Sequence, residues 1–139
     1  MCSQWNLFRN LKPYNAHISI ANGDTIEAAG IGEIVINVKN TNGHESPITL
    51  REVLYVPGLG PNNLVSVCCI QLAGAAIHFA GSGRNEVNIL ANRDEITVAR
   101  LLHNSYVLSA EIAPHEWGKT NAPTANQAQH SKHCGTLTQ

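Results

Sequence analysis

The fold is decided by the stretch Leu50-Arg51-Glu52-Val53-Leu54-Tyr55-Val56-Pro57-Gly58-Leu59, followed after two residues by Asn62-Asn63-Leu64-Val65-Ser66-Val67. Its first part predicts a strand over 48–56 that ends at a Pro-Gly pair. Regular structure is not expected over 57–61, because proline removes backbone donors and glycine allows sharp turns. Asn62 or Asn63 then caps a predicted short helix over 64–72, which Gly74 ends.

Upstream of this stretch, alternating residues predict three further strands. The segment 16–21 alternates polar and apolar residues, and Asn22-Gly23 supplies the turn that leads into a return strand over 25–29. A strand over 33–40 follows, with Ile34, Ile36 and Val38 on one face, and Thr41-Asn42-Gly43 forms the next turn. Residues 1–15 are expected to be an irregular or short helical lead-in that plugs one end of a barrel.

Downstream, four short strands are predicted over 75–79, 86–90, 95–101 and 105–108. They are separated by turns at Gly81-Ser82-Gly83 and Asn92-Arg93-Asp94. Many short strands at close spacing favour an antiparallel barrel or sandwich over a parallel sheet. The predicted fold is therefore all-β, a small closed or partly open antiparallel β-barrel with one short helix.

Composition narrows the function classes. The chain has 139 residues, enough for one domain, with 43% hydrophobic and only 14% charged residues. A net charge of -1 with scattered lysines and arginines gives no field that attracts a polyanion, so nucleic-acid binding by the chain itself is not expected. No apolar run approaches the ~20 residues that span a bilayer, which predicts a cytoplasmic protein without membrane contact.

The same stretch, with pieces on both sides of it, resembles the β-barrel segment of copia-type retrotransposon Gag-Pol polyproteins over about residues 1–112. The strand that ends in Leu54-Tyr55-Val56-Pro57-Gly58 and the following Asn63-Leu64-Val65-Ser66-Val67 carry most of the likeness. Five further pieces are similar to the family in the same order: Cys2-Ser3-Gln4-Trp5-Asn6-Leu7-Phe8, Ile20-Ala21-Asn22-Gly23-Asp24-Thr25-Ile26, Gly30-Ile31-Gly32-Glu33-Ile34-Val35-Ile36, Ile77-His78-Phe79 and Leu102-His103-Asn104-Ser105-Tyr106-Val107-Leu108. The resemblance implies a retropepsin-like, acid-protease barrel over 1–112.

The family's aspartic-protease motif, Asp-Ser/Thr-Gly-Ala, has no counterpart in this sequence. Its place lies just ahead of the run that Met1-Cys2 matches. The two aspartates present, Asp24 and Asp94, are not followed by Ser/Thr-Gly. Aspartic proteases need two carboxylates that share one proton, and in retroviral-type enzymes each half of a homodimer supplies one. The resemblance therefore implies a parent aspartic endopeptidase, and the residues predict no catalytic residue in the chain as it stands.

Two short segments resemble parts of a retroviral protease site. Gly30, Ile31 and Gly32 stand where such proteases carry a glycine-rich flap tip, although a β-bulge or hairpin bend explains the same glycines equally well. Asn63, Leu64 and Val65 resemble the residues that wall the active site, with Asn62 in place of the arginine that precedes them.

Metal sites and cofactors are not predicted. The four cysteines, Cys2, Cys68, Cys69 and Cys134, lack paired spacing and are expected to be buried or half-buried free thiols. His130-Ser131-Lys132-His133-Cys134 holds three soft ligands, but without a Cys-x-x-Cys partner it is expected to bind metal only adventitiously. It lies in residues 113–139, which are rich in Thr, Asn, Gln, Ala and His and are predicted to be a disordered polar tail.

Three functions stay open at this point. The first is a truncated transposable-element fragment, acting as a remnant or an interaction module without catalysis. The second is an active endopeptidase that processes Gag-Pol, if the Asp motif lies upstream of a wrongly assigned start. The third is a domesticated barrel that binds proteins. The partners expected are a second copy of the chain or Gag and Pol chains.

Overall fold

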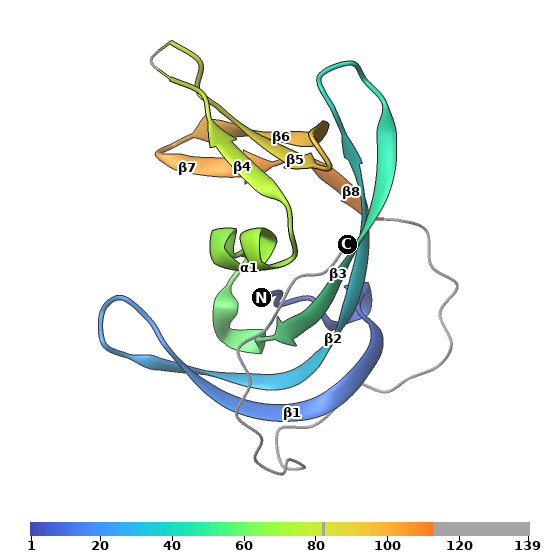
Figure 1. Cartoon of the computed structure of the whole chain (residues 1–139). Coiled ribbons are helices and arrows are strands. Elements are labelled where there is room, and N and C mark those ends of the chain that lie inside the picture. The colour runs from blue at the N-terminus through green and yellow to red at the C-terminus, as the bar shows by residue number, and fades with distance from the viewer. Residues whose placement is uncertain (82, 113–139) are drawn as a thin grey trace.

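The computed structural model describes residues 1–81 and 83–112, which form two antiparallel four-stranded sheets with one short α-helix between them (Figure 1). The first sheet contains β1 Arg9–Ser19, β2 Thr25–Lys39, β3 Glu45–Tyr55 and β8 Ala110–Ile112. The second contains β4 Ala76–Phe79, β5 Glu86–Ala91, β6 Asp94–Leu102 and β7 Ser105–Leu108. The helical elements are η1 Trp5–Leu7, η2 Pro57–Leu59 and α1 Val67–Leu72.

The long strand β2 organises the first sheet. Its first half pairs with β1, its second half pairs with β3, and β8 pairs with the segment from Ile36 to Val38. Sequence patterns predicted two strands here, over 25–29 and 33–40, and that division was wrong. No turn separates them, because Gly30 and Gly32 continue the ladder with partners on β1 and β3.

Strand β1 begins earlier than predicted. The lead-in is helical only over Trp5–Leu7, and the strand starts at Arg9 and includes Pro13. Proline is tolerated because, in the part of the chain that the structure describes, β1 is an edge strand whose one partner is β2. Register shifts between Arg9 and Lys12 and between Pro13 and Ala16, with a positive φ of 54° at Asn10, bend the strand and hide its period from a simple pattern search.

The second sheet follows the prediction closely. Its four strands match the predicted ones to within two residues, and Asn92-Arg93 and His103-Asn104 have positive φ, as tight hairpin turns require. The three-residue strand β8 was not predicted. It brings the chain back to the first sheet, where Ala110, Glu111 and Ile112 pair with Val38, Asn37 and Ile36.

Helix α1 is shorter than predicted and has a different cap. It begins at Val67 because the hydroxyl of Ser66 accepts a hydrogen bond from the backbone N–H of Cys69 at 3.3 Å. Neither Asn62 nor Asn63 caps it. Gly74, with φ 89°, ends it as predicted, and Pro57–Leu59 forms one 3-10 turn where regular structure was not expected.

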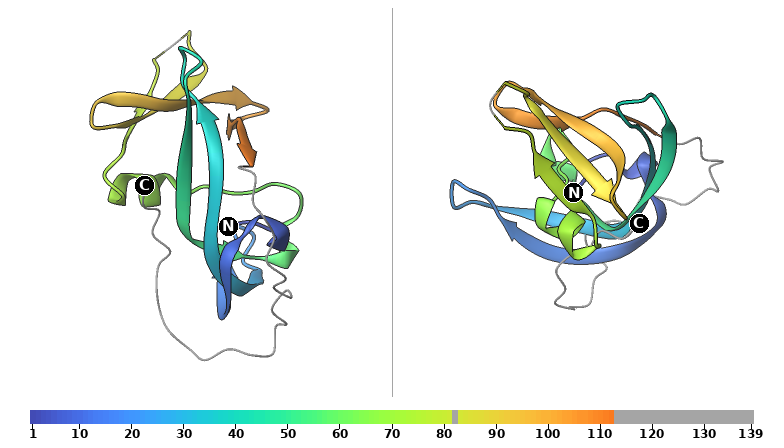
Figure 2. Two further views of the ribbon diagram at one scale, coloured as in Figure 1. Left: turned by 90° about the vertical axis from the view of Figure 1, so that its right-hand side faces the viewer. Right: turned by 45° about the horizontal axis from the view of Figure 1, so that its top comes forward.

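The core lies on the inner face of the first sheet. From Ile34 onward β2 alternates strictly, and Ile34, Ile36 and Val38 are buried as predicted. Strands of the second sheet cross those of the first above this face (Figure 2). Over residues 1–81 and 83–112 the sheets do not close on themselves, so the fold is all-β and partly open. None of the helices in these residues has the length and apolar character needed to cross a membrane.

Candidate functional site

The chain begins near α1 (Figure 1), where Met1 and Cys2 form an extended segment with an isolated β-bridge, called the N-terminal strand below. Met1 and Leu64 exchange two backbone hydrogen bonds of 2.8 and 3.0 Å. On the other side, the Cys2 N–H donates to the Leu54 carbonyl and the Cys2 carbonyl accepts from Val56 N–H, both at 2.9 Å, in a parallel bridge to Tyr55. Met1 and Cys2 therefore lie between β3 and the segment that leads into α1.

Burial shifts the pKa values of two groups in this strand, the Met1 ammonium and the Cys2 thiol. Desolvation lowers the pKa of the Met1 ammonium below its ordinary value, against a smaller raising effect of Cys2 and Cys69. Desolvation also raises the pKa of the Cys2 thiol, which contacts the Gln4 backbone. The thiol is thus kept protonated, and this buried sulfur is a packing group, with its side chain in the core cluster beside Phe8 and Tyr55.

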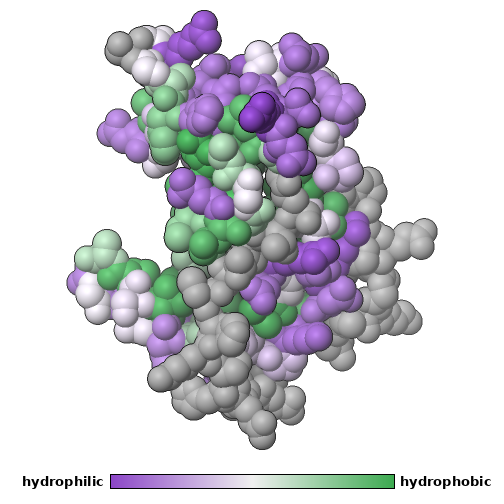
Figure 3. All heavy atoms as spheres, in the orientation of Figure 1, coloured by the Kyte–Doolittle hydropathy of each residue, from purple (hydrophilic) through white to green (hydrophobic). Residues whose placement is uncertain are grey.

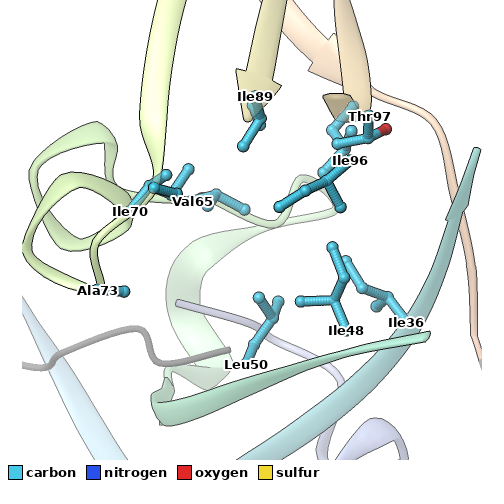
Figure 4. Close-up of a pocket in the computed structure, with 11 residues that line it drawn as sticks. Ile36, Ile48, Leu50, Val65, Ile70, Ala73, Ile89, Ile96 and Thr97 are labelled. Carbon is cyan, nitrogen blue, oxygen red and sulfur yellow. The ribbon is translucent and has the colours of Figure 1, made fainter. Parts of the chain in front are cut away.

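An apolar cavity of about 50 Å³ lies between the two sheets and α1 (Figure 4). Side chains of β3 and β2 point across it toward Ile89 and Ile96, and Val65 and Ile70 close one side. Of the described residues that line it, only Thr97 has a polar side chain, and its hydroxyl donates to the Lys39 carbonyl at 3.0 Å. Apolar cavities that take a benzene ring are about 150 Å³. This cavity suits one small apolar group and offers no reactive group.

The predicted wall residues lie at this cavity and at the N-terminal strand. Val65 lines the cavity while 43% of its surface stays exposed, and Leu64 is 51% exposed and pairs with Met1. Asn63 is exposed. The structure thus pairs Leu64 with Met1 and places Val65 at the cavity. Their role as a wall of an active site stays a prediction.

The predicted flap residues lie inside β2. Gly30 pairs with Pro13 on one side and Tyr55 on the other, and Gly32 pairs with Val53. A Cβ on Gly32 would lie 3.0 Å from the Arg9 carbonyl oxygen. The register also shifts between Gly32 and Ile34. This irregularity agrees with the β-bulge that the sequence offered as the other explanation of these glycines. The structure gives these glycines a packing role at a close strand contact, and a flap role for them and Ile31 stays a prediction.

Comparison with known families gives this geometry a context. The family model described as the Pol polyprotein β-barrel domain matches residues 1–75. The chain belongs to this family. No curated protein and no solved structure matches it. The match spans β1 to α1, including the N-terminal strand, Gly30-Ile31-Gly32 and Asn63-Leu64-Val65, and it ends at Ala75 just before the second sheet.

Over residues 1–81 and 83–112 of this Pol β-barrel chain, Asp24 and Asp94 lie in different sheets and do not form a dyad. Asp24 follows the turn after β1, where the Asn22 side chain donates to its carboxylate at 2.6 Å and accepts from its N–H at 3.0 Å. Asp94 opens β6, after the Asn92-Arg93 turn of the second sheet. Asp24 thus flanks a turn, as predicted, whereas the predicted turn at Asn92-Arg93-Asp94 ends one residue earlier, because Asp94 pairs with Ala91 as the first residue of β6. Over residues 1–81 and 83–112, no group of three or more His, Cys, Asp or Glu residues is placed to hold a metal ion.

Sequence reasoning missed one carboxylate that joins the sheets. Glu95 on β6 accepts from the Thr41 N–H at 2.7 Å and from the Thr41 hydroxyl, and its other oxygen accepts from the Asn88 amide at 2.6 Å. The Thr41 bonds lower the pKa of Glu95, with a smaller contribution from Asn88. No sequence signal links residues 54 positions apart, since a lone glutamate after a turn looks like any solvated residue.

The predictions for the cysteines and for the C-terminal segment have different outcomes. Cys2 and Cys69 are buried free thiols, as predicted, whereas Cys68 is exposed because it faces away from the core on α1. Cys134 and the His130 to Cys134 cluster lie outside the described residues, as does the whole predicted tail over 113–139.

Proposed function

We propose that this chain is a copia-type Gag-Pol fragment that serves as a retropepsin-like β-barrel module without catalysis of its own. The observation that carries this proposal is the position of its two aspartates. Asp24 is held by Asn22 in a turn of the first sheet, and Asp94 begins a strand of the second. Neither is followed by Ser/Thr-Gly.

The chemistry of aspartic proteases explains why this position matters. Two carboxylates must lie side by side and share one proton, one as base on water and the other as acid. The Asp24 carboxylate already accepts a hydrogen bond from Asn22 at an exposed turn. It offers no site that excludes water or aligns a second carboxylate.

The module proposed extends over 1–112, beyond the family match. Ile96 of β6 and Leu108 of β7 pack against the buried cluster of the first sheet, and β8 joins that sheet directly. The second sheet thus completes the same core. Limited proteolysis tests this extent: a stable product that ends near residue 75 would contradict it.

Peptidase assays test the lack of catalysis. The purified chain is incubated with a Gag-Pol-derived peptide library from acidic to neutral pH, with and without an aspartic-protease inhibitor, and no inhibitor-sensitive cleavage is expected. Inhibitor-sensitive cleavage that Asp24→Asn or Asp94→Asn abolishes would overturn the proposal. A second chain, extended before Met1 by Asp-Ser-Gly-Ala-Thr-Ser-His, tests the alternative in which upstream sequence supplies the motif. Cleavage by the extended chain alone would favour that alternative.

A protein-binding barrel is the second candidate, and exposed apolar side chains favour it. Figure 3 shows apolar atoms gathered around α1, between the second sheet and the β1–β2 hairpin. Leu64, Val67 and Leu72 are exposed there. We propose a second copy or Gag and Pol chains as partners, in the cytoplasm. Analytical ultracentrifugation at high concentration tests self-association, and pull-down of tagged Gag tests the other partner. A clean monomer that does not retain Gag would argue against this candidate.

A further inference from the structure

Two hairpin tips at opposite ends of β2, residues 20–24 and 40–44, share one backbone arrangement and one Asn-Gly pair (Figure 1). In each tip, the first residue donates its N–H to the carbonyl of the fifth and accepts from the glycine N–H. Both bonds are 2.9 Å around Asn22 and 3.0 Å around Asn42. Gly23 and Gly43 have φ values of 89° and 79°, and both pairs are exposed. The two asparagines therefore differ little in their backbone surroundings.

The side chains of the two asparagines are held differently. The Asn22 amide nitrogen donates to the Asp24 carboxylate at 2.6 Å, and its amide oxygen accepts from the Asp24 N–H at 3.0 Å. In the other tip, the Asn40 side-chain oxygen accepts from the N–H groups of Asn42 and His44, so the His44 N–H is already engaged. Within the part of the chain that the structure describes, no hydrogen bond holds the Asn42 side-chain amide.

We propose that Asn42-Gly43 is a site of spontaneous deamidation, and that Asp24 protects Asn22 from the same reaction. The Gly43 backbone nitrogen gives its proton to water or hydroxide and attacks Cγ of Asn42, and the Cγ–Nδ2 bond breaks so that ammonia leaves. Water then opens the cyclic imide at either carbonyl carbon, which gives aspartate or isoaspartate. Glycine favours the attack because it has no side chain to crowd the nitrogen, and nothing lies within 4 Å of a Cβ built at Gly43.

Asp24 slows the reaction at Asn22 in two ways. Its hydrogen bonds must break before Cγ of Asn22 can turn toward the Gly23 nitrogen, and its negative charge disfavours the anion that forms during the attack. The glycine N–H bond of the turn must also open, but this requirement is the same in both tips. Breaking one hydrogen bond to a charged group slows a step by at least about tenfold, so we expect this difference in rate between Asn42 and Asn22.

Deamidation of Asn42 changes a contact between the sheets. Thr41, which precedes it, donates its N–H and its hydroxyl to Glu95 on β6. The product places a new carboxylate one residue from this contact, and the two negative charges repel each other. In isoaspartate the main chain also runs through Cβ and Cγ, which lengthens the turn that positions Thr41. The reaction therefore weakens the bond between Thr41 and Glu95.

Peptide mapping by mass spectrometry tests the proposal on the purified chain, incubated in mildly alkaline buffer. Each deamidation adds about one mass unit to its peptide, and an isoaspartyl methyltransferase labels the isoaspartate. Modification at Asn42 is expected to be at least about tenfold faster than at Asn22. The same chain unfolded in urea is the reference, in which this ratio should fall toward unity. A ratio that is equal in the folded and the unfolded chain would overturn the proposal.

Exchanging the residues that follow the two glycines isolates the effect of Asp24. Asp24→His is expected to raise the rate at Asn22, because both the carboxylate and its bond to the amide are lost. His44→Asp is expected to lower the rate at Asn42, because it supplies a carboxylate to a tip with the same backbone bonds. Both positions are exposed, so the folded state is expected to persist. Unchanged rates in both variants would overturn the protection by Asp24.

Amide exchange by NMR tests the consequence for the sheets. After conversion of Asn42, the Thr41 N–H is expected to lose the protection that its bond to Glu95 provides. The Asn42→Gln chain, incubated in the same way, is the control, because glutamine must form a larger ring and reacts more slowly. Unchanged Thr41 exchange after conversion would overturn the link between this reaction and the contact of the sheets. A peptidase result does not affect the reading of these experiments.

Discussion

The two sheets differ in how many of their side chains are buried. The first sheet supplies most of the buried core cluster, through Ala29, Ile34, Ile36, Val38, Val53 and Tyr55. In the second sheet only Val87, Thr97 and Ala99 are buried among the described strand residues. Strands of the first sheet reach 15 residues, whereas those of the second have between four and nine. The first sheet therefore carries most of the hydrophobic stabilisation.

The second sheet depends on the first through a few specific contacts. Thr97 donates to the Lys39 carbonyl, Glu95 accepts from Thr41, and apolar side chains of both sheets meet around a cavity. Losing contacts of this kind opens a substructure before the whole protein unfolds. We expect amides of β4 to β7 to exchange faster than those of β2, and substitutions test this difference directly.

Gly32→Val has the largest expected effect. A Cβ at Gly32 meets the Arg9 carbonyl oxygen at 3.0 Å and the Leu11 Cα at 3.1 Å, and both are backbone atoms that a rotamer change cannot move. We expect a loss of about 3 kcal/mol in the free energy of unfolding, measured by urea titration. Gly58→Ala is the control, since nothing lies within 4 Å of its Cβ. Equal stability of both variants would show that β1 and β2 do not pack this closely.

Val38→Ala probes the buried face of the first sheet. Val38 is fully buried on β2, and removing two methyl groups leaves a cavity that the paired strands β3 and β8 cannot fill. We expect a loss of about 2 kcal/mol. Val107→Ala in the second sheet, where the side chain is 42% exposed, should change stability by no more than about 0.5 kcal/mol. A larger loss at Val107 would reverse the ranking of the two sheets.

The two sheets also differ in how well their strands could be predicted from the sequence. The second sheet was predicted because its turns, at Asn92-Arg93 and His103-Asn104, are local and use residues that tolerate positive φ. In the first sheet the strand alternation of Ile34, Ile36 and Val38 was also local and was predicted correctly. The continuity of β2 through Gly30 and Gly32 was missed, because glycines that allow a close strand contact look the same in sequence as glycines that make a turn.

The candidate site was predicted less completely than the fold. The stretch Asn63-Leu64-Val65 was singled out by resemblance, yet its pairing with Met1 depends on a contact across 63 residues that no local pattern encodes. The helix cap was assigned to asparagines, which are good caps, although Ser66 performs the task one residue before the helix. Several residues before α1 have similar capping propensities, and contacts elsewhere in the fold decide which of them caps the helix.

Thr97→Val tests a single contact between the sheets. Thr97 is 1% exposed, and valine has nearly the same shape but cannot donate to the Lys39 carbonyl. A carbonyl left without this bond in a buried contact destabilises the fold, and we expect a loss of about 1.5 kcal/mol. The loss should appear mainly as faster amide exchange in β5 and β6. Thr25→Val, at an exposed position, is the control. Uniform faster exchange in both sheets would show that they unfold as one unit.

Glu95→Gln has the smallest expected effect and the clearest dependence on pH. Hydrogen bonds from Thr41 and Asn88 hold the pKa of Glu95 below its ordinary value of 4.5 in the folded protein. The charged carboxylate therefore contributes stability that is complete above about pH 4.5 and is lost as the pH falls through the lower, folded-state pKa. Glutamine accepts fewer and weaker bonds, so we expect a loss of about 1 kcal/mol at pH 7.

The free energy of unfolding of the unsubstituted chain and of Glu95→Gln is measured between pH 7 and pH 3. This series separates the effect of the Glu95 charge from that of the side chain's shape. The difference in unfolding free energy between the given chain and Glu95→Gln should shrink as the pH falls, because protonation removes the charge that the Thr41 N–H and hydroxyl stabilise. Glu86→Gln is the control, since Glu86 lies 3.6 Å from Arg100 in an exposed pair within the second sheet. A constant difference across this range would mean that the Thr41 contact holds the sheets together by packing. A difference that shrinks only at Glu95 would show that the charge of this carboxylate contributes to holding the two sheets together, beside the uncharged contact of Thr97 with the Lys39 carbonyl.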